Sequence, residues 1–170
     1  MCARNSRVDV LKSLHLVEPN KCVGCRICEN ICSLTKEKCS NPKLSRIKVV
    51  KLERSGVDEP TFCRQCVDPP CAKVCDVEAI HRDQNEARVI IDEDKCIGCG
   101  KCLPVCPFSA LTLHPDRRVA IKCDLCDGTP KCAAWCPTQA IIYAESFENP
   151  SLKQTSRSIN SLKGSDKGDC

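Results

Sequence analysis

The chain has 170 residues, of which 19 are cysteine and only five are Phe, Trp or Tyr. This composition excludes a core built mainly from bulky side chains, and it requires that clustered cysteines hold metal or form disulfides. The 26 basic and 22 acidic residues contain no dense basic run, so a nucleic-acid partner is not expected.

The chain shows no signal-peptide pattern in residues 1–19 and no apolar run near the roughly 18 residues of a membrane span. We therefore expect a cytoplasmic protein without a membrane span. Thiols stay reduced in the cytoplasm, so clustered cysteines there usually bind metal.

The first cysteine motif reads CVGCRICENIC over residues 22–32 and follows a short predicted strand at 14–17. This spacing is the bacterial ferredoxin pattern, in which three cysteines hold one 4Fe-4S cluster and the fourth reaches a second cluster. Residues 33–45 are polar, with a predicted turn at Asn41-Pro42. The alternation over residues 46–53 predicts a strand.

The second motif, CRQCVDPPCAKVC over residues 63–75, has a wider middle gap that contains Pro69-Pro70. Residues 78–82 and 88–92 flank a polar turn and predict a hairpin leading to the third motif. That motif, CIGCGKCLPVCP over residues 96–107, has the ferredoxin spacing together with its closing proline. A second hairpin is predicted over residues 110–121.

The fourth motif, CDLCDGTPKCAAWCP over residues 123–137, has the widest middle gap, and its exit at 138–144 repeats the exit of the third motif. Residues 145–170 are rich in Ser, Asn and Lys, without a periodic apolar pattern. They predict a flexible polar tail or an arm that a partner orders. The predicted division is therefore a four-motif domain at residues 1–144 and a tail at residues 145–170.

No arrangement of residues in the sequence indicates catalysis, so a non-catalytic protein is expected. His15, His81 and His114 are predicted to lie on the surface, and Trp135 to pack over a cluster. Basic residues beside the motifs are either solvated or serve to raise a potential or dock a partner. These residues are Arg26, Arg64, Lys73, Lys101 and Lys131. The cysteines outside the motifs are interpreted as ordinary thiols, and these are Cys2, Cys39 and Cys170.

The order of the four motifs and their widened gaps resembles the four-cluster electron-transfer subunits related to those of dimethyl sulfoxide reductase, formate dehydrogenase and nitrate reductase. The resemblance covers residues 20–144. It implies an α+β fold of two interleaved ferredoxin-like modules with short hairpins and short helices. Motifs one and four would form one module, and motifs two and three the other.

The resemblance also implies four ligand sets, one for each of four 4Fe-4S clusters. Set A is Cys22, Cys25, Cys28 and Cys136. Set B is Cys32, Cys123, Cys126 and Cys132. Set C is Cys63, Cys66, Cys71 and Cys106. Set D is Cys75, Cys96, Cys99 and Cys102.

The resemblance implies an electron-transfer subunit between a large catalytic redox subunit and a second carrier. The sequence CVGCRICENICSL, followed by NPKLSRIKVV, looks most like compact subunits that serve tungsten aldehyde oxidoreductases, benzoyl-CoA reductases or CO dehydrogenases. A tungsten or molybdenum partner is favoured over a nickel partner. The alternatives are a subunit of CO dehydrogenase, formate dehydrogenase or hydrogenase, a free polyferredoxin, and a zinc-binding interaction module.

Overall fold

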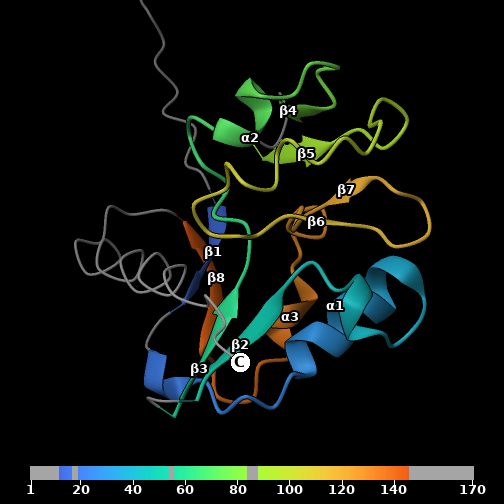
Figure 1. The fold of residues 1–170 in the computed structure, drawn as a ribbon. Helices are drawn as coiled ribbons and strands as arrows, with labels where there is room; N and C mark the ends of the chain where they lie inside the picture. Colours follow the sequence, from blue (N-terminus) through green and yellow to red (C-terminus); the bar gives the residue numbers. More distant parts are fainter. Residues whose placement is uncertain (1–11, 17–18, 54–55, 84–87, 146–170) are drawn as a thin grey trace, which may run out of the picture.

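The computed structural model describes residues 12–16, 19–53, 56–83 and 88–145. These ranges form a small mixed fold in which short helices alternate with two-stranded antiparallel sheets (Figure 1). The mixed helix-and-strand class expected from the sequence is confirmed. Except for Glu145, the predicted tail lies outside the described residues, as do Cys2 and Cys170.

Strand β1 (Lys12–Leu16) pairs with strand β8 (Ile141–Glu145), with Leu14 opposite Tyr143. The two strands lie side by side in Figure 1 although they come from opposite ends of the described chain. This pairing brings the segment before the first motif next to the segment after the fourth. The strand predicted at 14–17 is confirmed as far as Leu16, because Val17 lies outside the described residues.

Helix α1 (Ile27–Glu37) carries the last two cysteines of the first motif. Its buried residues are Cys28, Glu29, Cys32 and Ser33, and residues four apart lie on the same face of a helix. The polar pair is buried because it bonds to backbone. Glu29 accepts the Val49 N–H at 2.7 Å, and the Ser33 hydroxyl accepts the Asn41 N–H at 3.1 Å. The first part of the polar segment at 33–45, as far as Glu37, is therefore the end of this helix, which the sequence analysis did not predict.

After a 3-10 turn at Pro42–Leu44, the strand predicted at 46–53 appears as β2 (Lys48–Leu52). The Asn41 side chain caps the turn by accepting the Lys43 N–H at 3.0 Å, which confirms the predicted turn. Strand β2 pairs with β3 (Val57–Thr61), where Pro60 lies opposite Val49. Proline has no backbone N–H to donate to a neighbouring strand, so within sheets it is confined to edge strands. It is tolerated in β3 because this sheet has only two strands, and both are edge strands.

The two predicted hairpins around the third motif are confirmed. Strand β4 (Ile80–Arg82) pairs with β5 (Val89–Ile91), and β6 (Thr112–Leu113) pairs with β7 (Ala120–Ile121). A one-turn helix begins at the last residue of the widened gap in the second and in the fourth motif and carries the third cysteine of that motif: α2 (Pro70–Lys73) and α3 (Lys131–Ala134). A 3-10 turn at Pro19–Lys21 precedes the first motif.

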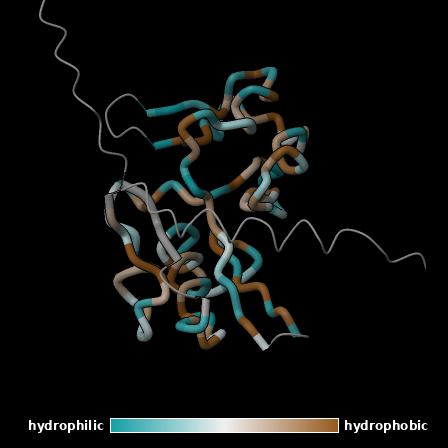
Figure 2. The backbone as a smooth tube through the Cα atoms, turned by 90° about the vertical axis from the view of Figure 1, so that its left-hand side faces the viewer, coloured by the Kyte–Doolittle hydropathy of each residue, from teal (hydrophilic) through white to brown (hydrophobic). Residues whose placement is uncertain are grey.

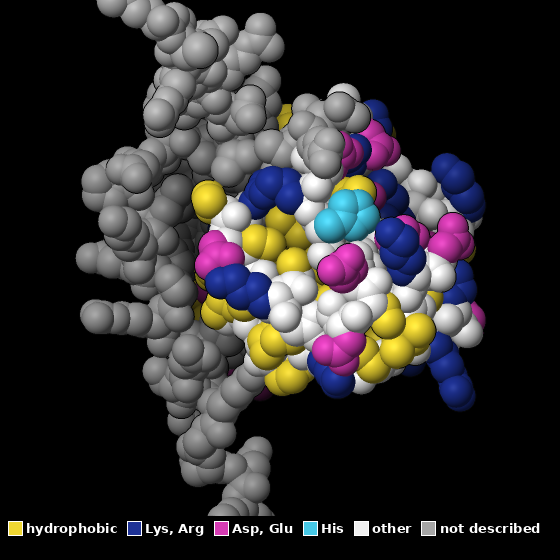
Figure 3. All heavy atoms as spheres, turned by 90° about the horizontal axis from the view of Figure 1, so that it is seen from above, with side chains coloured by type: hydrophobic (Ala, Val, Ile, Leu, Met, Phe, Trp, Pro, Cys, Tyr) yellow, Lys and Arg dark blue, Asp and Glu magenta, His cyan; other side chains and the backbone are white. Residues whose placement is uncertain are grey.

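The core consists of two apolar clusters in which cysteines do much of the packing. The larger cluster surrounds Phe62 and Ile47, which are 0% and 1% exposed, and the smaller one surrounds Val89. Cys106 packs against both. Apolar residues occur in short stretches separated by polar ones (Figure 2), and none of the described helices combines the length and apolar character of a membrane span. Viewed from above, acidic, basic and apolar side chains are interspersed (Figure 3).

Candidate metal centres

Two partly enclosed cavities are each lined by four cysteines. One cavity contains all of set C on its wall, between Pro69-Pro70 and Phe108. The other contains all of set D beside Gly98 and Ala120. The structure therefore brings together the members of each of these two sets.

The other two sets are recognised by the mutual influence of their thiols. Burial raises the pKa of Cys22, and the neighbouring Cys25 and Cys136 thiols add to the shift. Burial likewise raises the pKa of Cys132 to about 12, with Cys32 and Cys126 adding to it. Members of set A, and likewise members of set B, are close enough to repel one another as thiolates.

Electrostatic effects between thiols link set A to set B, set B to set C and set C to set D. Cys28 of set A acts on Cys132 of set B. Cys63 of set C acts on Cys123 of set B, in addition to the dominant effect of burial on the pKa of Cys123. Cys71 of set C acts in the same way on Cys102 of set D, whose pKa is raised, chiefly by burial, to about 11. The sets are therefore linked in the order A, B, C, D.

Backbone N–H groups point at several of these sulfurs. Arg46 N donates to Cys32 Sγ at 3.3 Å, Ala120 N to Cys96 Sγ at 3.4 Å and Ala110 N to Cys106 Sγ at 3.5 Å. The pKa of Cys136 is lowered, against the opposing effect of burial, by backbone and side-chain hydrogen bonds. Such bonds stabilise thiolates, which are the form that binds metal.

Gly98 allows the third motif to wrap closely around its cavity. Its φ is +67°, and an added Cβ would lie 1.8 Å from the Arg118 carbonyl oxygen. Only glycine fits both the left-handed conformation and this close approach. The loop between Cys96 and Cys99 is therefore built around a residue without a side chain.

The exposure of the sixteen motif cysteines differs between the sets. Only Cys25 of set A and Cys99 of set D are exposed, whereas every cysteine of sets B and C is buried or half-buried. Cys39, outside the motifs, is also exposed, which confirms its interpretation as a surface thiol. No cysteine in the described ranges forms a disulfide.

The donor set fits a multinuclear cluster better than a single ion. Within the described ranges, no three His, Cys, Asp or Glu side chains converge tightly enough to hold one metal ion. The thiols instead surround two cavities, and softness of the sulfur ligands favours iron–sulfur clusters or zinc over hard cations. Burial raises the pKa of eight of the sixteen motif thiols, including Cys28 to about 12, so binding would release protons.

Three sequence predictions about side chains near the motifs need correction. Trp135 is 61% exposed and does not pack as a core residue. His114, predicted on the surface, is 5% exposed, and its Nδ1 accepts the backbone N–H groups of Asp116 and Arg117, both at 3.2 Å. Arg64 stacks on Phe62, 4.6 Å from the ring centroid, so it is not simply solvated. His81 is exposed as predicted, and the His15 side chain is not described.

A network of ion pairs, not anticipated from the sequence, joins α1 to the hairpin after the third motif and to the fourth motif. Arg117 donates to both carboxylate oxygens of Glu37, at 2.8 and 2.9 Å, and Arg46 reaches Glu37 at 3.4 Å. Arg46 and Lys36 also contact Asp124, at 3.3 and 2.7 Å. These pairs connect residues up to 88 positions apart, so spacing along the sequence could not reveal them.

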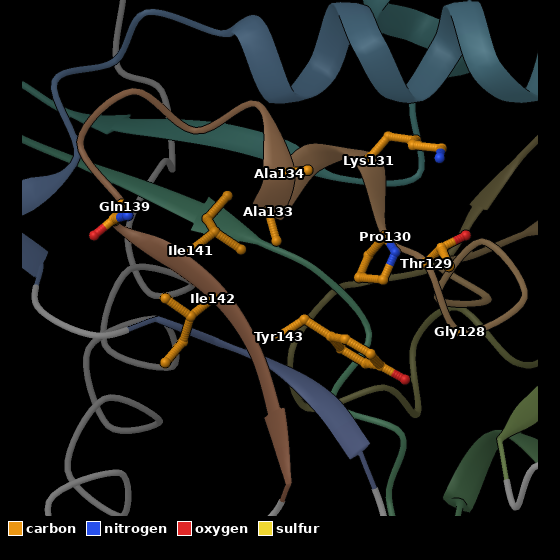
Figure 4. Close-up of a pocket in the computed structure, with 10 residues that line it drawn as sticks. All are labelled: Gly128, Thr129, Pro130, Lys131, Ala133, Ala134, Gln139, Ile141, Ile142 and Tyr143. Carbon is orange, nitrogen blue, oxygen red and sulfur yellow. The ribbon is translucent and has the colours of Figure 1, made fainter.

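A surface hollow between the fourth motif, α3 and β8 is shown in Figure 4. Pro130, Ile141 and Tyr143 form its apolar side, and Lys131 extends away from it. Its wall has no cysteine, histidine or acidic residue, so it is not a metal centre.

Cavities lined by cysteine, with backbone N–H groups directed at sulfur, define an iron–sulfur protein. Residues 57–146 match the family described as the 4Fe-4S dicluster domain. The chain belongs to this family.

Two curated relatives illustrate its range. The aliphatic sulfonate oxidoreductase, polyferredoxin-like subunit, of Pyrococcus furiosus is 44% identical over 92 residues, which cover 54% of this chain and 53% of the relative. The electron transport protein HydN of Escherichia coli K12 is 38% identical over 103 residues, covering 56% and 57%. The chain thus spans little more than half the length of these relatives.

Among solved structures, a chain of the active site complex BamBC of benzoyl coenzyme A reductase with 1,5 dienoyl-CoA is similar at 26% identity. Its TM-score is 0.48, with coverage of 82% of this chain and 78% of that one. A likeness this remote supports no conclusion about fold or function.

Proposed function

We propose that this chain is a non-catalytic electron-transfer subunit that binds four 4Fe-4S clusters through sets A, B, C and D. The observation that carries the proposal is the pair of partly enclosed cavities, each lined by four cysteines. The clusters would supply one-electron storage at each position. The protein would hold them in sequence, with motifs one and four forming one ferredoxin-like module and motifs two and three the other.

The order of the sets supports a relay between two separate surfaces. Sets A and D are at the ends of the order, and each contains one exposed cysteine. Exposed apolar side chains accompany both ends: Val23 is 62% exposed beside set A, and Ile97 is 70% exposed within the loop of set D. Partners that exchange electrons would dock there, while the apolar packing around sets B and C keeps water away.

The partner is proposed to be a larger redox enzyme, with a tungsten enzyme of the aldehyde oxidoreductase or benzoyl-CoA reductase type favoured. One relative is named as a subunit of an aliphatic sulfonate oxidoreductase, which supports a catalytic partner. A further relative, formate hydrogenlyase subunit 2 of Escherichia coli K12, is 33% identical over 102 residues, and its name supports the second candidate, a role beside a formate- or hydrogen-converting enzyme. The tail at 145–170 is proposed as a partner-binding arm, and we place the protein in the cytoplasm.

Metal analysis and EPR of protein purified without oxygen test the proposal. We expect about sixteen iron atoms per chain, four for each proposed cluster, and signals of interacting clusters after reduction. About four zinc atoms and no iron would refute it in favour of an interaction module. Tungsten, molybdenum or nickel in a co-purifying protein would identify the class of partner. Deletion of residues 150–170 should weaken co-purification without lowering iron content, and full co-purification would refute the arm.

A further inference from the structure

Lys122 is a buried lysine between sets B and C. Five lysines directly precede a motif cysteine: Lys21, Lys95, Lys101, Lys122 and Lys131. Lys122 is 4% exposed, whereas the other four are exposed. The sequence alone gives no sign of this difference.

The position of the Lys122 ammonium is set by backbone acceptors. Its Nζ donates to the Val89 carbonyl in β5 and, at 3.1 Å, to the Cys123 carbonyl. None of the described carboxylates forms an ion pair with it. A buried ammonium with only neutral partners retains most of its field, since neither water nor a counter-charge screens it.

Set C lies beside this charge. Val89, whose carbonyl accepts the Lys122 Nζ, lines the cavity that contains all four cysteines of set C. A buried cation favours added negative charge at a neighbouring site. Reduction of a bound cluster adds one negative charge, and local charge is a main determinant of cluster potential.

We propose that Lys122 raises the reduction potential of the cluster held by Cys63, Cys66, Cys71 and Cys106. This inference depends on the proposed function, because it requires a cluster in set C. Lys122 would act on this potential through its charge and would not bind the cluster.

The test is an EPR-monitored redox titration of the whole, anaerobically purified protein. In Lys122→Met the midpoint potential of one cluster should fall while the other three stay unchanged, and Lys122→Arg should retain the original value. Lys95→Met is the matched control, because it removes the charge of a 59% exposed lysine that also precedes a motif cysteine. Lys95→Met should shift the midpoint potential of each cluster by less than Lys122→Met shifts the potential of the cluster in set C.

Gln65→Leu separates charge from architecture. The Gln65 amide contacts the same two residues, donating to the Cys123 carbonyl at 2.8 Å and accepting the Val89 N–H at 2.8 Å. Its loss removes hydrogen bonds at the same place but no charge, so the potential of set C should not fall as it does in Lys122→Met. An equal fall would overturn the inference and indicate a structural effect.

Iron content distinguishes the two proposals. Wild-type protein without iron refutes the proposed function itself. Four intact clusters with an unchanged potential in Lys122→Met refute only the role of Lys122. If Lys122→Met fails to retain iron, Lys122→Gln decides, since it keeps a donor for the Val89 carbonyl. Loss of iron in both Lys122→Met and Lys122→Gln would show that the ammonium is required for folding, and it would overturn the proposed role of Lys122 in setting the potential.

Discussion

Replacement of Glu37 by Gln should destabilise the protein far more than loss of a surface carboxylate. The Glu37 side chain is 12% exposed and accepts Arg117 through both oxygens, and Arg46, which it also contacts, is 11% exposed. His114 contributes as well: because its Nδ1 accepts two N–H groups, its proton is on Nε2, which faces Glu37 at 3.6 Å. Glu37→Gln keeps the shape of the side chain and removes the negative charge with which Arg117, Arg46 and His114 interact.

Removal of one partner from a buried ion pair costs about 3–5 kcal/mol. The cost here should be smaller, because Arg46 keeps Asp124 at 3.3 Å and Arg117 keeps Glu93 at 2.9 Å. We therefore expect Glu37→Gln to lower the free energy of unfolding by about 2–3 kcal/mol, since charge-assisted hydrogen bonds contribute about 1.5–3 kcal/mol each. That corresponds to roughly a 30- to 150-fold change in the folded-to-unfolded ratio.

Anaerobic denaturant titration, followed by the visible absorbance of the bound clusters, measures this effect. Where unfolding is irreversible, the rate of absorbance loss at fixed denaturant replaces the equilibrium value. Asp68→Asn is the control, because Asp68 pairs with Lys73 and their side chains are 73% and 62% exposed. Exposed pairs contribute about 0–1 kcal/mol. If the two variants behave alike, the ion-pair network contributes nothing beyond surface charge and the reasoning is wrong.

Two further predictions concern the third motif and a buried carboxylate. Gly98→Ala should lose about a quarter of the iron, because the added Cβ would clash with the Arg118 carbonyl oxygen. Gly100→Ala is the control and should keep its iron, because nothing lies within 4 Å of a Cβ added there. Equal iron content in the two variants would contradict the predicted clash. Burial raises the pKa of Glu59 despite the opposing charge of Arg64, so its favourable contribution is present at acid pH and lost as pH rises through the raised pKa. Glu59→Gln should therefore unfold at higher denaturant than wild type at neutral pH, with the difference shrinking toward about pH 4.3, the ordinary glutamate pKa; a difference independent of pH would contradict this.

The parts of the fold that the sequence predicted are local. The hairpins at β4–β5 and β6–β7 follow from apolar runs separated by polar turns, and β2 follows from alternation. Strand β3 was not recognised because VDEPT is polar and contains Pro60. Its place is understandable only with its neighbours known, since the N–H of Val49, opposite Pro60, is used by Glu29.

Burial of polar side chains was the main feature that could not be predicted. Residues 33–37 looked like a polar segment, yet Ser33 is fully buried in α1 because it bonds to the Asn41 backbone. His114 and Lys122 are buried for similar reasons, through backbone groups and, for His114, a carboxylate on a distant helix. Each partner is set by tertiary contact, whereas the motif cysteines could be selected because their spacing is a local signal.

The charges near set A and near set C act in opposite directions. Set A lies near the carboxylates of Asp58 and Glu29, which raise the pKa of Cys22 and Cys28 in addition to the dominant effect of burial. Set C lies near the ammonium of Lys122, which bonds to the carbonyl of Val89 in the wall of the set C cavity. With the proposed ligands, the carboxylates would therefore oppose added negative charge at set A, and Lys122 would favour it at set C.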